Sequence, residues 1–142
     1  MQTVRSIMTP DPACCHATTP LQDVARLMSD RDCGGIPVVD ADGKPVGFVT
    51  DRDIALRIVA EGKAGGIAAD AMSTPCKAIN ASMTLYDCTN LMELEKIRRV
   101  PIVDDDGRVA GIVAVADLAR SGRANALDAV VTHVSEPGPK PQ

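Results

Sequence analysis

Aromatic residues and positive charge are both scarce in this chain of 142 residues. There is one Phe, one Tyr and no Trp, so the aromatic platforms on which many proteins stack unpaired bases are missing. The formal net charge is −4, whereas nucleic-acid-binding domains normally carry a basic stripe. We therefore expect no nucleic-acid partner.

The sequence also lacks segments that would place it in or beyond a membrane. No apolar run approaches the roughly 20 residues that a transmembrane helix needs, and residues 1–7 lack the apolar core of a signal peptide. Five cysteines, an odd number without an export signal, favour a reduced setting. We expect a cytoplasmic protein with no membrane partner.

Motifs of common enzymes and metal sites are missing as well. There is no Gly-x4-Gly-Lys-Ser/Thr loop, no Gly-x-Gly-x-x-Gly fingerprint and no convincing pair of nucleophile and base, so we predict no catalytic residue and no enzyme. Cys14, Cys15 and His16 lack the spacing of a zinc site, and the acidic turn at 104–107 lacks the pattern of a calcium loop. We predict no metal. A thiol redox sensor stays open as a lesser alternative.

What the chain does contain is an internal repeat with a constant offset of 64 residues, as from Pro37 to Pro101. Gly-Ile-Pro-Val-Val-Asp at 35–40 returns as Arg-Val-Pro-Ile-Val-Asp at 99–104. Each copy is followed by a turn glycine and by an apolar segment that contains another glycine. Because these features recur together without a gap, the chain is a duplicated supersecondary unit.

The duplication predicts how the chain is divided. We expect a first unit at 1–62, a linker at 63–66, a second unit at 67–123, and an extension with a flexible tail at 124–142. Units of about 60 residues would be marginal alone, which suggests that the two pack face to face.

Each unit is expected to contain a helix, a hairpin and a second helix. In the first unit, Thr19 is the expected N-cap and Pro20 the first residue of a helix that ends at Gly34 and Gly35. Because proline cannot donate to a ladder, each hairpin proline is expected at a strand start or a bulge. The remaining predicted segments are strands at 36–39 and 46–49, a helix at 51–62, a helix at 83–97, strands at 100–103 and 109–113, a helix from 117, and either a helix or a strand at 124–134.

Two βαββα units in tandem, each with an apolar-Pro-apolar-apolar-Asp strand, resemble a pair of CBS (cystathionine beta-synthase) domains, the Bateman module. The resemblance covers about residues 3–121. It implies an α/β fold with two repeats packed about a pseudo-twofold axis, clefts that bind adenosine-containing ligands, and association into a homodimer. The implied function is a regulatory module that needs no cofactor, senses AMP, ADP, ATP or S-adenosylmethionine, and signals through an unidentified effector protein. A ligand-free interaction or stress-response scaffold is the alternative.

The segment 47–53, Gly-Phe-Val-Thr-Asp-Arg-Asp, is the most informative for such a ligand. Thr50 is the expected N-cap of a helix whose free first-turn amides would suit a phosphate. Asp53 lies one turn further, where a carboxylate can accept two hydrogen bonds from a ribose diol. The resemblance assigns phosphate to Thr50 and ribose to Asp53. Thr-x-x-Asp is also close to a capping box, which needs no ligand.

The second copy departs from this pattern, because Ala114 replaces Thr50 while Asp117 is kept. The second cleft is therefore expected to be weaker, to take a different ligand or to be empty. Arg98 and Arg99 occupy the positions of Gly34 and Gly35, where the resemblance suggests a phosphate contact; an exposed, solubilising pair is the plainer interpretation. The other candidate pocket residues, several of which suit a plain core equally well, are Gly35, Ile36, Ala17, Thr18 and Ile79.

Overall fold

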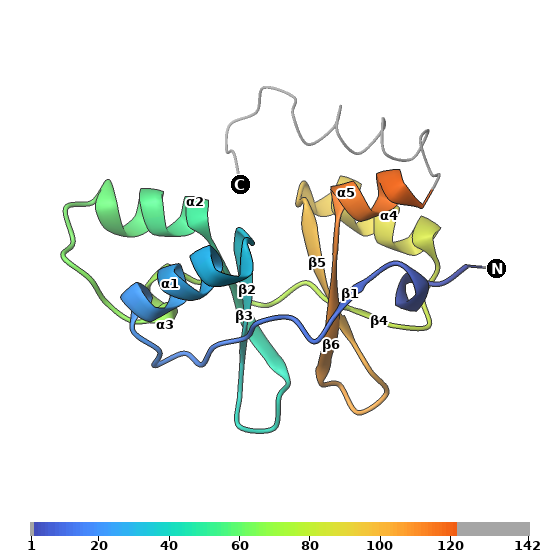
Figure 1. Cartoon of the computed structure of the whole chain (residues 1–142), viewed down its shortest axis with the longest axis horizontal. Helices are drawn as coiled ribbons and strands as arrows, with labels where there is room; N and C mark the ends of the chain where they lie inside the picture. Colours follow the sequence, from blue (N-terminus) through green and yellow to red (C-terminus); the bar gives the residue numbers. More distant parts are fainter. Residues whose placement is uncertain (1, 122–142) are drawn as a thin grey trace. The chain divides into compact units, whose positions relative to one another are not determined.

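The computed structural model describes residues 2–121 (Figure 1). The predicted extension at 124–142, including the segment of undecided structure, lies outside the described residues. Helices and strands alternate along the chain, which confirms the predicted α/β class.

The chain forms two compact units, and each unit combines segments from both sequence repeats. Unit 2 consists of Asp11–Lys77 and Gly107–Val109, whereas the described parts of unit 1 are residues 2–10, 78–106 and 110–121. The first ten residues thus pack with the second repeat, and the corresponding segment after the linker packs with the first. The repeats read from the sequence and the compact units are therefore different divisions of the chain.

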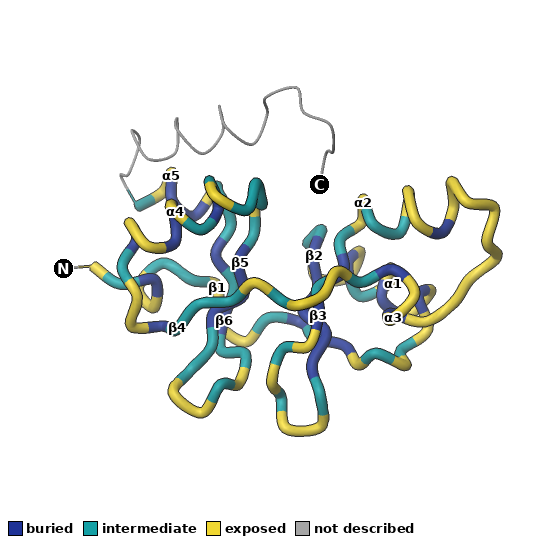
Figure 2. Tube along the Cα trace, turned by 180° about the vertical axis from the view of Figure 1, so that it is seen from behind, coloured by how far each residue is buried: buried dark blue, intermediate teal, exposed yellow. Residues whose placement is uncertain are grey.

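Unit 2 is built around an antiparallel hairpin of β2 (Gly35–Val39) and β3 (Pro45–Thr50). Its helices are α1 (Leu21–Arg31), α2 (Asp51–Ile54), the π-helical turn η2 (Ala55–Val59) and α3 (Ala68–Ala71). All five residues of β2 are buried (Figure 2). The core joins apolar side chains of the hairpin, α1 and α3, among them Ile36, Val38, Val49, Leu21, Val24, Ala68 and Ala71.

Unit 1 contains a four-stranded sheet with the strand order β1-β6-β5-β4. β1 (Thr9–Pro10) pairs antiparallel with β6 (Val109–Ala114), and β4 (Ile79–Asn80) pairs parallel with β5 (Arg99–Val103). The helical elements are η1 (Val4–Ser6), α4 (Leu85–Glu95) and α5 (Val115–Arg120). Val4 is fully buried in this core beside residues of α4, β5 and β6, which anchors the N-terminal segment there.

The ends of the first helix differ from the prediction. The Thr19 hydroxyl accepts from the His16 N–H at 3.0 Å and does not cap the helix; Pro20 is the N-cap and the helix begins at Leu21. The helix ends at Arg31, and its C-cap Asp32 has a left-handed φ of 51°, so the helix stops before the two glycines. In the second repeat Lys96 takes the same role with a φ of 56°, and α4 begins at Leu85, two residues later than predicted.

The hairpin prolines also lie elsewhere than predicted. Pro37 is the third of five residues in β2, and the register shift follows one residue later, between Val38 and Val39. Phe48, which faces Pro37, directs its N–H and C=O to Ser73 at 3.1 and 2.8 Å. A proline is tolerated mid-strand because this pair exchanges no hydrogen bond and the proline nitrogen therefore needs no partner in β3.

None of the helices in the described part of the chain is long and apolar enough to cross a membrane. The five cysteines are all free, and Cys15 and Cys88 lie in the cores of unit 2 and unit 1. Burial raises the pKa of Cys15 and of Cys76 from 9.0 to about 11, and that of Cys88 to about 12. The pKa of Cys14 is also raised by burial, partly offset by the nearby charge of Arg31.

These raised thiol pKa values predict a loss of stability at alkaline pH. Between pH 9 and 12 the unfolded chain releases a Cys88 proton that the folded chain retains, so the stabilisation present below pH 9 is lost as the pH rises. The melting temperature should fall across this range, and less steeply in Cys88→Ala. If the melting temperatures of the two proteins fell equally with pH, the raised pKa of Cys88 would be contradicted, because all other titrating groups are shared.

Candidate functional site

Thr50 and Asp53 form a closed pair at the junction of β3 and α2. Thr50 is the last residue of β3 and the N-cap of α2, as predicted. Its Oγ1 accepts from the Asp53 N–H at 3.0 Å, and Asp53 Oδ2 accepts from the Thr50 N–H at 2.8 Å. The two residues are therefore a reciprocal capping box, which satisfies two amides without any ligand.

The prediction of free amides in the first turn of this helix is wrong. The Asp51 N–H donates to the Gly34 carbonyl at 3.0 Å, and the Arg52 N–H donates to the Asp51 carboxylate at 2.8 Å. The third amide is the Asp53 N–H, which Thr50 accepts. Sequence alone missed the Gly34 carbonyl, because that acceptor reaches the helix only once β2 and β3 pair.

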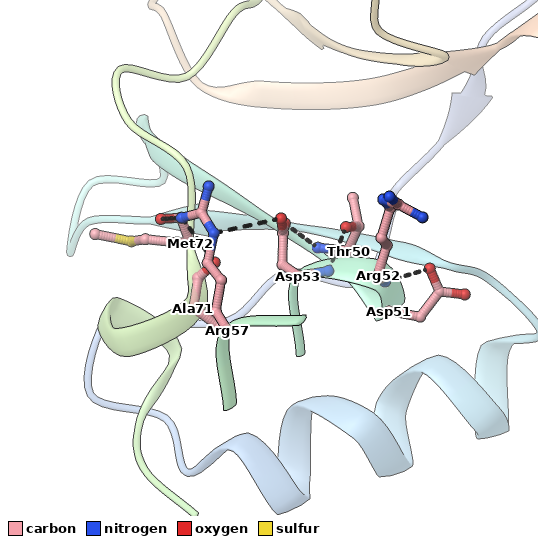
Figure 3. A network of polar contacts seen from close by, with 7 residues as sticks. All are labelled: Thr50, Asp51, Arg52, Asp53, Arg57, Ala71 and Met72. Carbon is pink, nitrogen blue, oxygen red and sulfur yellow. Dashed lines mark hydrogen bonds and ion pairs between the residues drawn. The ribbon is translucent and has the colours of Figure 1, made fainter. Parts of the chain in front are cut away.

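The structure adds the basic side chain of Arg57 to this pair, one turn after Asp53 (Figure 3). Its Nε lies 3.9 Å from Asp53 Oδ1, and its Nη1 donates to the carbonyl oxygens of Met72 at 3.0 Å and Ala71 at 3.4 Å. No signal in the sequence indicated Arg57, because its carbonyl partners, Ala71 and the C-cap Met72 at the end of α3, lie more than ten residues away along the chain.

The other candidates of unit 2 are only partly brought together. Gly35 pairs with Thr50 across the hairpin, so its backbone lies directly beside the capping box. Ile36 is fully buried in the core. Ala17 and Thr18 lie in the turn before α1, where the Ala17 carbonyl accepts from the Ala69 N–H at 2.9 Å. Ile36 thus has the surroundings of a core residue, and Gly35, Thr50 and Asp53 form the local group.

The equivalent junction in unit 1 has a different carboxylate environment. Asp117 is 5% exposed, and its Oδ2 accepts from the Ala114 N–H at 2.7 Å. Its Oδ1 accepts from the Arg120 guanidinium. Ala114 offers no hydroxyl, so only half of the capping box exists. Both oxygens of Asp117 are thus engaged, which leaves less capacity for a ribose than Asp53 has.

The predicted arginine pair and Ile79 occupy separate positions in unit 1. The Arg98 carbonyl accepts from the Val115 N–H at 3.1 Å, as the Gly34 carbonyl does in the other repeat, and its side chain is exposed. Arg99 begins β5. Ile79 lies in β4 opposite Ile102 and packs against the core.

A pocket of about 330 Å³ lies against Asp117 in unit 1. Besides Asp117 it is lined by Gln2, Ser6, Ile7, Arg120 and Ser121. The N-terminal residues were not predicted to lie there. The repeat predicted that these N-terminal residues pack with the first repeat. In the structure they pack with the second repeat, because the first segments of the two repeats are exchanged.

The surroundings of four cysteines and of His16 bear on thiol and metal chemistry. The thiolate is the reactive form of cysteine, and burial raises the pKa of Cys14, Cys15, Cys76 and Cys88. His16 Nδ1 lies 3.0 Å from the Val39 carbonyl oxygen, to which it can donate. Among the residues that the structure describes, no three His, Cys, Asp or Glu side chains are grouped so that they could hold a metal ion.

Two solved structures that align with this chain contain adenosine ligands, and a third contains zinc ions. The CBS domain pair of protein MJ0100, in complex with 5′-methylthioadenosine and S-adenosyl-L-methionine, aligns with a TM-score of 0.79 and 26% identity over 88% of this chain and 98% of that chain. CBSX2 in complex with AMP aligns with a TM-score of 0.76 and 25% identity over 88% of this chain and 99% of that chain. Hypoxic Response Protein I with two coordinated zinc ions aligns with a TM-score of 0.77 and 30% identity, over 84% and 98%.

Sequence relatives extend over nearly the whole chain. The CBS domain-containing protein YhcV of Bacillus subtilis is 39% identical over 137 residues, which covers 95% of this chain and 96% of YhcV. Hypoxic response protein 1 of Mycobacterium tuberculosis is 31% identical over 143 residues, covering 96% of each chain. The family model of the CBS domain matches residues 4–60 and again 68–123. The chain therefore belongs to the CBS domain family, as a tandem pair of CBS domains.

Proposed function

We propose that this protein is a regulatory module that binds an adenosine-containing ligand, with Thr50 and Asp53 as its phosphate and ribose contacts. The observation that carries the proposal is the spare hydrogen-bonding capacity of the capping box. Asp53 uses Oδ2 for the Thr50 N–H, whereas within the described part of the chain Oδ1 has only the Arg57 charge at 3.9 Å. The Thr50 hydroxyl accepts from Asp53 and keeps its own hydrogen to donate.

The ligands of similar proteins fit that capacity. S-adenosyl-L-methionine, 5′-methylthioadenosine and AMP, which are bound by the MJ0100 pair and by CBSX2, all carry a ribose diol. A diol that donates to Asp53 Oδ1 would leave the Thr50–Asp53 pair intact. AMP, ADP, ATP and S-adenosylmethionine are accordingly the ligands that we propose for this chain, with the junction at Asp117 as the weaker site.

A ligand-free interaction scaffold is the second candidate. The closed capping box favours it, because every first-turn amide of α2 already has an acceptor within the chain. In that case the Thr-x-x-Asp pattern serves helix stability alone. We propose the nucleotide-binding function ahead of it because Thr84 and Asp87 form an equal capping box at α4, where Thr84 pairs with Thr3 and not with a glycine. A capping box by itself therefore does not require the glycine that pairs with Thr50.

A thermal-shift panel separates these two functions. Extensively dialysed protein is melted with AMP, ADP, ATP, S-adenosylmethionine and NAD in turn. A ligand at 100 times its Kd should raise stability by about 2.7 kcal/mol, and at least one compound of the panel is expected to do so. A flat response to the whole panel would favour the scaffold.

Asp53→Ala tests the assigned contact, with Asp87→Ala as the matched control. Each variant loses one capping carboxylate, at a cost of about 1 kcal/mol of stability. Only Asp53→Ala should also lose nucleotide affinity, by at least about tenfold, since a hydrogen bond to a charged group contributes about 1.5–3 kcal/mol. Asp117→Ala should matter less. Calorimetric titration of the three folded variants decides; unchanged affinity in Asp53→Ala would remove Asp53 from the site.

We also propose that the module is cytoplasmic, acts through an effector protein and forms a homodimer. The dimer proposal rests on α4, where Tyr86 and Leu94 are 63% and 76% exposed although Leu85 and Met92 of the same helix are buried. The larger apolar residues of α1 are buried or half-buried, so α1 offers less apolar surface for such a contact than α4 does.

Light scattering should therefore give twice the chain mass of 14.9 kDa at micromolar concentration. Leu94→Glu is expected to produce monomers, because a charge would have to be buried in the contact between two α4 helices. Val46→Glu, at an exposed apolar position on β3, is the control and should remain dimeric. A monomeric natural chain would rule out this assembly.

A further inference from the structure

The side chain of Arg57 connects two elements of unit 2 that are separate in the sequence (Figure 3). Its Nη1 donates to the carbonyl oxygens of Met72 and Ala71, at the end of α3, at 3.0 and 3.4 Å. Its Nε faces Asp53 Oδ1 from the other side at 3.9 Å. The guanidinium thus lies between the carbonyls at the end of α3 and the carboxylate that caps the first turn of α2.

The carbonyl contacts explain why the guanidinium stays in place. The last carbonyls of a helix have no partner within it, and a cation there is favoured by both hydrogen bonding and the helix dipole. A side chain that is 51% exposed, as Arg57 is, would otherwise gain little from a single ion pair. Two carbonyl acceptors restrict it to one arrangement, in which Nε is directed to Asp53.

This arrangement orients the Asp53 carboxylate but leaves one of its oxygens able to accept a further hydrogen bond. Its side chain is 15% exposed, and Oδ2 is held by the Thr50 N–H. At 3.9 Å, Arg57 Nε attracts Oδ1 electrostatically without forming a hydrogen bond with it. Oδ1 consequently has a fixed direction and can still accept from a hydroxyl.

The second repeat has no arginine at the position equivalent to Arg57. The offset of 64 residues places Ser121 at the position of Arg57, and the basic residue near Asp117 is Arg120, one position earlier. Arg120 donates directly to Asp117 Oδ1. Of the two equivalent carboxylates, only Asp53 thus combines an oriented oxygen with a remaining acceptor.

We propose that Arg57 is a positioning residue for ribose recognition. From its attachment to the Ala71 and Met72 carbonyls it holds Asp53 Oδ1 toward the 2′,3′-diol of the ligand, and it makes the end of α3 part of the binding site. This role rests on the proposed function, and it goes beyond the Thr-x-x-Asp pattern, which does not include Arg57.

Calorimetric titration with AMP and with 2′,3′-dideoxy-AMP tests the role in the full chain. Arg57→Met should weaken AMP binding by about two- to fivefold, the range of a partly exposed charge pair, and should leave the dideoxy compound unaffected. In an Asp53→Asn background, Arg57→Met should have no further effect on AMP, because the oriented oxygen no longer carries the charge on which Arg57 acts. Arg26→Met, at an exposed position on α1, controls for the loss of one positive charge.

The outcomes separate this role from its alternatives. Equal losses for AMP and for the dideoxy compound would show that Arg57 acts through overall charge or structure, and would overturn the positioning role. Unchanged AMP affinity in a folded Arg57→Met protein would overturn it as well. Failure of AMP to bind the natural chain would instead refute AMP as the ligand, and the role of Arg57 toward it would fall with that result.

Discussion

The structure depends on the way in which a hairpin strand turns directly into a helix. The first amide of such a helix has no partner within the helix, and in both repeats a carbonyl just before the first hairpin strand accepts from it: Gly34 for Asp51, and Arg98 for Val115. The contact is possible only when the two strands pair in register. Strand pairing and helix initiation therefore stabilise each other, and they fix the place where a capping carboxylate lies.

Around that junction the two repeats have diverged in charge more than in backbone. Each keeps an aspartate that accepts from the backbone N–H three residues earlier. In one, a hydroxyl completes the capping box and an arginine is held at a distance; in the other, the hydroxyl is absent and an arginine bonds to the carboxylate. A duplicated framework has thus produced two carboxylates with different remaining capacity for a ligand.

The exchange of the first segments between the repeats adds a second packing constraint within each unit. Met8 and Met72 lie in equivalent positions of the sequence, and each packs where a glycine of the opposite repeat leaves room, at Gly111 and Gly47. A side chain at either glycine would meet the neighbouring backbone carbonyl at about 3 Å, at Thr9 or Ser73. These glycines therefore serve the close approach of an exchanged segment, which gives a structural reason for their presence that is independent of any ligand.

The sequence by itself determined the duplication, the α/β class, the hairpins to within about a residue and Thr50 as a helix N-cap, because these follow from local patterns repeated at a constant offset. Tertiary structure decided what local patterns do not encode. The acceptor for the Asp51 amide, the carbonyls that hold Arg57 and the N-terminal lining of the Asp117 pocket all come from segments distant in the chain. The C-caps Asp32 and Lys96 were not predicted, because the left-handed conformation at the end of a helix is usually adopted by glycine and neither residue is one.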